Sequence, residues 1–202
     1  MSEQFDVAVV GGGIIGLAHA WRAAERGLRV AIFERDVAAQ GATVRNFGMI
    51  WPVGQPAGEL YGLAMQSAAF WRHLGSLGVV SVEECGSIHL AYRADELAVL
   101  EEFCGNKSHQ SHMLSPNEIV QQTALANPNG LLGGMHSPTE LRVDPRTAAS
   151  QIASWLADKF DVKCYYRTCV TGVRDGKIRA ADGRSWQANC CIVCSGSDLQ
   201  TL

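Results

Sequence analysis

The segment Val7-Ala-Val-Val-Gly-Gly-Gly-Ile-Ile-Gly-Leu-Ala-His19 joins a short apolar run to the glycine pattern Gly11-x-Gly13-x-x-Gly16. The apolar run predicts a buried β-strand, and the residues after the glycines have the pattern of an α-helix. Gly11 lets the chain turn sharply at the strand end, and Gly13 leaves room for a pyrophosphate. Gly16 lets the helix pack closely on the sheet, with the helix N-terminus facing the phosphates. The segment therefore predicts a strand–turn–helix unit with a phosphate site at its turn.

A second strand and an acidic residue support this interpretation. The apolar run Leu28–Phe33 predicts a strand, and it leads directly into Glu34. That carboxylate follows the glycine pattern by about 20 residues, the spacing at which an acidic group accepts hydrogen bonds from an adenosine ribose. A glycine-rich turn can also be purely structural. The surrounding strands, helix and carboxylate favour a dinucleotide site.

Length and composition indicate a globular protein of one large domain, or of one domain with an insertion. The chain has 202 residues, of which 47% are hydrophobic and 18% charged, and its formal net charge is −3. The absence of a basic run argues against nucleic acid and anionic membrane surfaces as partners. The apolar segment 7–18 is too short to span a bilayer, and residues 1–6 lack the positive charge of a signal peptide. We therefore expect no membrane span and a cytoplasmic location.

The seven cysteines form an odd, unpatterned set that is typical of reduced thiols. Cys191-x-x-Cys194 has the spacing of a redox or metal pair, but it lies in an apolar strand, where residues three apart point to opposite faces. We interpret these residues as structural cysteines. His89 and His136 are single histidines without ligand spacing, so we expect no metal site.

The rest of the chain alternates between helical and strand patterns. Helices are predicted over 59–77, over 95–103, from Ser115 and over 144–160, and a strand over 86–92. From residue 162 the period changes to two, which predicts a small antiparallel meander over 162–187. A buried strand over 188–194 follows. The sequence ends at Leu202, where a further helix is expected, so we expect a fragment or a truncated reading frame.

With these elements in place, the whole chain resembles the amino-terminal half of flavoproteins of the D-amino-acid oxidase and glycine oxidase family. The matching motifs, in order, are the glycine fingerprint, Glu34-Arg35, the segment Gly41–Ile50, the segment Arg142–Arg146, the strand residue Val170, and Cys194-Ser195-Gly196. In that family the segment matching Gly41–Ile50 passes the pyrophosphate and lies along the flavin ring. The version Thr-Val-Arg-Asn-Phe-Gly-Met further resembles a subgroup proposed to oxidise aminophosphonates.

The resemblance implies an α/β fold, with a Rossmann-like FAD-binding domain and an inserted, partial α+β substrate domain. The expected boundaries are 1–80 for the first part of the FAD-binding domain, 81–143 for the substrate-domain segment and 144–202 for the second FAD-binding part. The implied cofactor is FAD. The residues implied to bind it are Gly11, Gly13, Ile15, Gly16, Glu34, Arg35, Thr43, Asn46, Gly48, Val170, Ser195 and Gly196.

Arg45 is the candidate substrate-binding residue. A guanidinium beside the flavin could hold an anionic group in a bidentate geometry, although an ordinary surface arginine is an equal alternative. Arg142 is a weaker candidate. Thr43 and Asn46 could donate hydrogen bonds to the cofactor or could simply form a turn. No catalytic acid or base is identified, because the cofactor carries the chemistry in this family.

These features give three hypotheses. In the first, the protein oxidises the C–N bond of a small amino acid or aminophosphonate by hydride transfer to flavin, with oxygen as the acceptor; its partner is then a small anionic amine. In the second, it is an NAD-dependent dehydrogenase, since Glu34 suits either adenosine dinucleotide. In the third, it is a truncated, non-catalytic dinucleotide-binding fragment. The oligomeric state stays open.

Overall fold

The computed structural model describes residues 3–198. The chain divides into two compact units, one formed by Met1–Phe47 together with Asp144–Leu202 and the other by Gly48–Val143. They are called unit 1 and unit 2 below. The predicted boundary at residue 80 assigns helix α2 (Glu59–Ser76) to the FAD-binding part, whereas the division into compact units places this helix in unit 2. Which functional domain this helix belongs to stays a prediction.

Unit 1 is built around a parallel sheet. Its strands are β1 (Gln4–Val10), β2 (Val30–Phe33), β9 (Lys163–Tyr165) and β12 (Ser185–Val193). Strand β1 lies between β12 and β2, with Val7 opposite both Cys190 and Val30. It is central and covered on both faces, which explains why its sequence is a continuous apolar run and not an alternating one.

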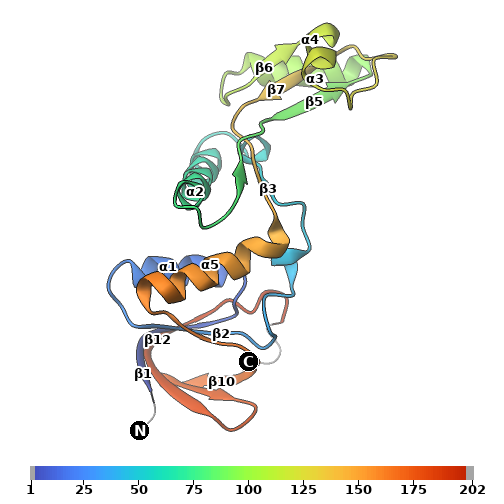
Figure 1. Ribbon diagram of the computed structural model, residues 1–202. Helices are drawn as coiled ribbons and strands as arrows, with labels where there is room; N and C mark the ends of the chain where they lie inside the picture. Colours follow the sequence, from blue (N-terminus) through green and yellow to red (C-terminus); the bar gives the residue numbers. More distant parts are fainter. Residues whose placement is uncertain (1–2, 199–202) are drawn as a thin grey trace. The chain divides into compact units, whose positions relative to one another are not determined.

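Helices and a meander cover the two faces of this sheet. Helix α1 (Ile14–Ala24) and helix α5 (Pro145–Phe160) lie side by side (Figure 1), and Trp21 meets Trp155 edge-to-face between them at 5.3 Å. On the other face, β10 (Val170–Arg174) and β11 (Lys177–Ala180) form an antiparallel meander with the first part of β12. The complete order is β10-β11-β12-β1-β2-β9. The predicted α/β architecture is confirmed, and so is the antiparallel pairing of the last three predicted meander strands. The start of the predicted meander at residue 162 is wrong, because β9 pairs in parallel with β2 at the edge of the sheet.

An aromatic cluster fills the space between the meander and the parallel sheet. Phe33 stacks on Tyr165 with ring centroids 5.1 Å apart, and Trp186 lies 4.8 Å from Phe33. Phe33 is 1% exposed. This core fixes the end of β2, from which the chain enters the candidate site.

Unit 2 contains two small antiparallel sheets and three α-helices. One sheet has the order β3-β8-β4, from β3 (Met49–Ile50), β8 (Leu141–Val143) and β4 (Val82–Glu83). The other has the order β5-β7-β6, from β5 (Ser87–Ala91), β7 (Gly133–Ser137) and β6 (His112–Leu114). The helices are α2 (Glu59–Ser76), α3 (Ala94–Gly105) and α4 (Pro116–Gln122) (Figure 1). Two short 3-10 turns, Ala42–Val44 in unit 1 and Pro52–Gly54 in unit 2, complete the fold.

Candidate functional site

Two glycines of the fingerprint are required by the backbone itself. Gly11 has φ +107°, and a Cβ built there would lie 2.3 Å from the carbonyl oxygen of Cys194. A Cβ at Gly16 would lie 2.0 Å from the carbonyl oxygen of Gly11. Both distances are far inside van der Waals contact. Gly11 therefore lets the turn lie against the backbone that follows β12, and Gly16 lets α1 pack closely on the turn and on β1.

Gly13 is different, because the fold does not fill the space in front of it. A Cβ there would meet a single heavy atom within 4 Å, the hydroxyl oxygen of Thr43 at 3.0 Å. Gly13 has ordinary backbone angles, φ −72° and ψ 173°, which any residue could adopt. The open space at Gly13 is therefore not required by the packing of the chain.

The N-terminus of α1 faces this open space. Gly13 is its N-cap residue and has no side chain to cap the helix, and the first turn carries no acidic residue. The hydroxyl of Thr43 accepts a hydrogen bond from the backbone N–H of Ile14 at 3.0 Å, and Ile15 is 66% exposed. N–H groups in the first turn of a helix have no carbonyl partner within the helix, and the helix dipole adds partial positive charge. This end of α1 can bind an anionic group such as a phosphate.

Glu34 is held rigidly beside the glycine turn. It is 8% exposed. Its Oε2 accepts a hydrogen bond from the N–H of Gly12 at 2.8 Å, and its Oε1 accepts one from the N–H of Asp36 at 3.0 Å. Each carboxylate oxygen has two lone pairs, so each can accept a further hydrogen bond. The side chain is thus pre-positioned for donors such as ribose hydroxyl groups.

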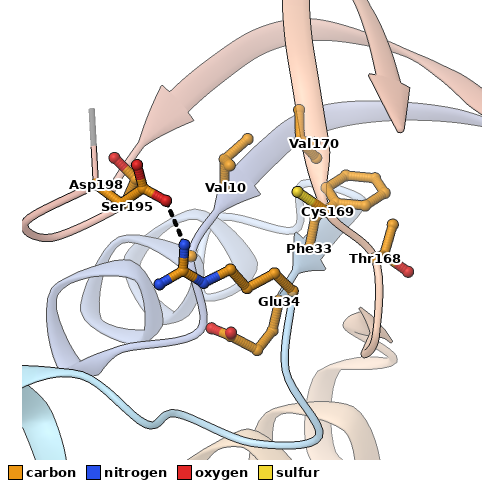
Figure 2. Close-up of a pocket in the computed structure, with 10 residues that line it drawn as sticks. Val10, Phe33, Glu34, Thr168, Cys169, Val170, Ser195 and Asp198 are labelled. Carbon is orange, nitrogen blue, oxygen red and sulfur yellow. Dashed lines mark hydrogen bonds and ion pairs between the residues drawn. The ribbon is translucent and has the colours of Figure 1, made fainter. Parts of the chain in front are cut away.

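A recess opens next to Glu34 (Figure 2). Figure 2 shows Phe33, Cys169 and Val170 grouped on one side of it and Ser195 and Asp198 on the other. The residues that line it are Val10, Gly11, Phe33, Glu34, Arg35, Thr168, Cys169, Val170, Ser195 and Asp198. The structure thereby brings the predicted Gly11, Glu34, Arg35, Val170 and Ser195 together. The walls combine apolar side chains with a few polar groups, as is typical of cofactor sites.

Two polar features of the recess bear on what it could hold. The guanidinium of Arg35 forms an ion pair with the carboxylate of Asp198. The hydroxyl oxygen of Ser195 is buried and has no hydrogen-bond partner within the described part of the chain. An unsatisfied buried hydroxyl costs about 1–3 kcal/mol, and a polar ligand atom in the recess would remove that cost. The residues present therefore fit an adenosine dinucleotide.

Five residues of the recess were not identified from the sequence. They are Val10, Phe33, Thr168, Cys169 and Asp198. The first two end predicted strands, the next two directly precede the predicted Val170, and Asp198 follows the predicted Ser195 and Gly196, so a position next to the end of a strand or to a predicted residue was the available signal. The backbone shows why Thr168 is there, since its N–H donates to the carbonyl oxygen of Glu34 at 2.9 Å.

The other predicted residues lie outside the recess. The side-chain amide of Asn46 donates to the carbonyl oxygens of Ala42 and Thr43, at 3.1 and 2.8 Å, which is the turn-forming role considered as its alternative. Gly48 is buried in unit 2, and its carbonyl oxygen accepts a hydrogen bond from Val143. Gly196 has φ +68° in the turn after β12 and an exposed position.

The two candidate arginines differ in their partners. Arg45 is exposed, and its side chain makes no hydrogen bond or ion pair with residues 3–198. Arg142 forms an ion pair with Glu83. A guanidinium without a protein partner is available to an anion, whereas a paired one is less so. The role of either arginine in substrate binding stays a prediction.

The structure offers no support for a reactive cysteine pair or a metal site. Burial, together with the neighbouring Cys190 and Cys194, raises the pKa of the Cys191 thiol to about 11. A thiol that stays protonated is a poor nucleophile and metal ligand. Within residues 3–198, no group of three or more His, Cys, Asp or Glu side chains could hold a metal ion. Among the helices of the same residues, none is both long and apolar enough to cross a membrane.

Comparisons with known proteins agree with the observed α/β fold. A glycine oxidase from Geobacillus kaustophilus (strain HTA426) is 28% identical over 211 residues, covering 98% of this chain and 56% of the relative. The crystal structure of glycine oxidase from Geobacillus kaustophilus matches with a TM-score of 0.84 at 26% identity, covering 96% of this chain and 56% of that one. L-alpha-glycerophosphate oxidase from Mycoplasma pneumoniae, with FAD bound, shares the fold, with a TM-score of 0.74 at 22% identity over 94% of this chain and 53% of that one.

The chain spans about half the length of these relatives. The family model described as FAD dependent oxidoreductase matches residues 6–202. Proteins of this family bind FAD. Because the match extends over nearly the whole sequence, the chain belongs to the FAD dependent oxidoreductase family.

Proposed function

We propose that the protein is an FAD-dependent oxidoreductase that oxidises the C–N bond of a small amino acid or aminophosphonate, with oxygen as the electron acceptor. The observation that carries the cofactor assignment is the Glu34 carboxylate, hydrogen-bonded to the N–H of Gly12 at 2.8 Å and lining a recess that also holds the unpartnered hydroxyl of Ser195. The amine substrate is supported by the similarity to glycine oxidase over 98% of this chain.

The residues around the recess and the N-terminus of α1 bind different parts of the cofactor in this proposal. The N-terminus of α1, around Gly13 and Ile15, binds the pyrophosphate, with Thr43 fixing the turn next to it. Glu34 accepts hydrogen bonds from the adenosine ribose, and the backbone at Val170 meets the adenine. Bound FAD supplies the hydride acceptor, which no protein side chain provides. The chain's own contribution is to hold the cofactor and to orient the substrate.

Arg45 is proposed to bind the anionic group of the substrate. Its free guanidinium can pair with a carboxylate or a phosphonate, and the latter would suit the aminophosphonate subgroup. Replacing such a contact costs about 1.5–3 kcal/mol, or about 10- to 100-fold in kcat/KM. Arg45→Ala should therefore lower kcat/KM for glycine much more than for a neutral amine of similar size. The control is Arg26→Ala, another exposed arginine, located just after α1. Equal losses on both amines would assign Arg45 to the cofactor or the fold.

Family membership favours FAD over the NAD-dependent alternative. The non-catalytic alternative is tested by cofactor content. We expect the purified chain to carry FAD, Gly13→Val to lose it because the side chain occupies the open space at the helix N-terminus, and Gly62→Val to keep it. Gly62 is a fair control because a Cβ there meets nothing within 4 Å. Full flavin content in Gly13→Val would refute the site, and absence of FAD from the parent chain would favour the non-catalytic fragment.

A further inference from the structure

The turn after β9 is held against Glu34 by backbone hydrogen bonds. The N–H of Glu34 donates to the carbonyl oxygen of Tyr165, and the N–H of Thr168 donates to the carbonyl oxygen of Glu34, each at 2.9 Å. The N–H of Arg167 donates to the carbonyl oxygen of Asp36, also at 2.9 Å. Thr168 and the two residues after it line one side of the recess (Figure 2). The turn therefore sets the spacing between Glu34 and that wall.

This turn contains a strained residue. Arg167 has φ +50°, in the left-handed region that residues with a side chain rarely adopt. Such a conformation persists only where the surrounding contacts hold it, and strained residues cluster at binding sites. The backbone hydrogen bonds to the segment after β2 supply part of that hold. A side chain from a different element adds to it.

That side chain is Arg184, which directly precedes β12. Its Nη2 donates a hydrogen bond to the hydroxyl oxygen of Thr168 at 3.0 Å. Thr168 is 1% exposed, and its own hydroxyl hydrogen is donated to the carbonyl oxygen of Tyr166 at 2.9 Å. A guanidinium only donates and a hydroxyl has one hydrogen, so both contacts have a fixed direction. Arg184 thus supplies the donor that the buried oxygen of Thr168 accepts from outside the turn.

Arg184 is itself held in place. Its Nε donates to a carboxylate oxygen of Asp182 at 2.8 Å, and its guanidinium carbon lies 5.3 Å from the centre of the Trp186 ring. Trp186 belongs to the aromatic core, with its ring centroid 4.8 Å from that of Phe33. An arginine that only closed the turn before β12 would need the carboxylate contact alone. The additional contact to Thr168 connects the wall of the recess to the rigid core.

We propose that Arg184 is a positioning residue for the adenosine end of the dinucleotide, acting through Thr168 on the spacing between Glu34 and the wall at Val170. This inference rests on the proposed function, in which Glu34 binds the ribose and the backbone at Val170 meets the adenine. Because base and ribose are directly bonded, one ligand can make both contacts only when their spacing is right. Arg184 does not touch the ligand; it holds the two contact points at that spacing.

Two nucleotides separate this role from a general effect on stability. ADP carries both ribose hydroxyl groups, whereas dideoxyadenosine diphosphate carries neither and does not depend on Glu34. A shift of Glu34 against the wall therefore weakens ADP binding and leaves the dideoxy nucleotide unaffected. For Arg184→Ala in the full 202-residue chain, freed of bound flavin, we expect ADP affinity to fall about 3- to 10-fold, the value of one hydrogen bond. Isothermal titration calorimetry measures both affinities.

The surrounding residues provide matched controls. Arg184 is half-exposed, so Arg184→Ala should fold. Arg179→Ala removes another exposed arginine, from the neighbouring strand β11, and should leave both affinities unchanged. Thr168→Ser keeps the hydroxyl and should bind ADP like the parent, whereas Thr168→Val removes it and should weaken ADP binding. If Arg184 acts through Thr168, adding Arg184→Ala to Thr168→Val should cause no further loss.

The outcomes distinguish this inference from the proposed function. Equal losses on the two nucleotides in Arg184→Ala would overturn the inference, because the residue would then serve the fold as a whole. If the parent chain binds FAD and Arg184→Ala leaves ADP affinity unchanged, the inference fails while the proposed function stands. If the parent binds ADP with the expected loss in Arg184→Ala but does not bind FAD, the inference stands and the proposed function fails. If it binds neither, both fail.

Discussion

Gly16→Ala is predicted to destabilise the fold even though alanine is the better helix former. The new methyl carbon would start 2.0 Å from the carbonyl oxygen of Gly11 and 3.1 Å from a methyl group of Val9, and contacts under 3.0 Å essentially never occur. The backbone must therefore move by about 1 Å at a turn that Gly11 already holds at φ +107°. Overpacking of this kind costs about 1–3 kcal/mol, occasionally more, and the gain in helix propensity returns about 1 kcal/mol.

We take the upper end of that cost because the obstructing atom is backbone. The net loss is then about 2 kcal/mol, which corresponds to a fall in Tm of about 4–8 °C for a chain of this length. Gly13→Ala is the matched comparison. It meets only the Thr43 hydroxyl at 3.0 Å, so it should change the unfolding free energy by no more than about 1 kcal/mol. Thermal unfolding followed by circular dichroism measures both. An unchanged or higher Tm for Gly16→Ala would refute the reasoning.

Three further predictions concern other parts of unit 1. Glu34→Gln should weaken FAD binding and lower the unfolding free energy by about 1–3 kcal/mol, because an amide NH₂ would face one of two N–H donors; an unchanged Tm would contradict this. Asp144→Ala removes the N-cap of α5 and should cost about 1 kcal/mol in urea unfolding, and a loss below the error of that measurement would show that the cap is dispensable. Burial raises the pKa of Cys191 to about 11 and the pKa values of Tyr165 and Tyr166 to about 12, from 9.0 and 10.0. The unfolded chain therefore loses these protons at a lower pH than the folded chain does, so the free energy of unfolding should fall as the pH rises from about 9 to 12. A urea midpoint that rises over that range would contradict this.

The sequence was most informative where structure is determined by neighbouring residues. The run before Gly11, the glycine spacing and the strand ending at Phe33 gave β1, the turn, α1 and β2 in their observed places. The caps at Ser115 and Asp144 marked the starts of α4 and α5. In each case a few adjacent residues carry the physical cause, through a φ angle, a missing Cβ or a side-chain oxygen near a free N–H.

Features that depend on distant segments were not accessible in this way. Thr168 enters the recess through its hydrogen bond to the backbone of Glu34, across more than a hundred residues of sequence. Glu140 reaches Val53 and Ser87 in the same manner, and nothing in its local sequence indicates a buried carboxylate. The apolar stripe of 59–77 predicted a helix correctly, yet Phe70 is 43% exposed. Periodicity determines that a helix forms, and the rest of the fold determines which face is covered.

The case for a ligand rests on the residues that the fold does not need. Gly11 and Gly16 would be required in any protein with this strand–turn–helix packing, since a Cβ at either position collides with backbone. Gly13 collides with nothing but one hydroxyl oxygen, and the buried hydroxyl of Ser195 has no partner within residues 3–198. Packing alone explains neither the open space nor the unsatisfied group, whereas a dinucleotide at the N-terminus of α1 and beside Glu34 explains both. Substitution at Gly13 should therefore separate cofactor binding from folding, and substitution at Gly16 should not.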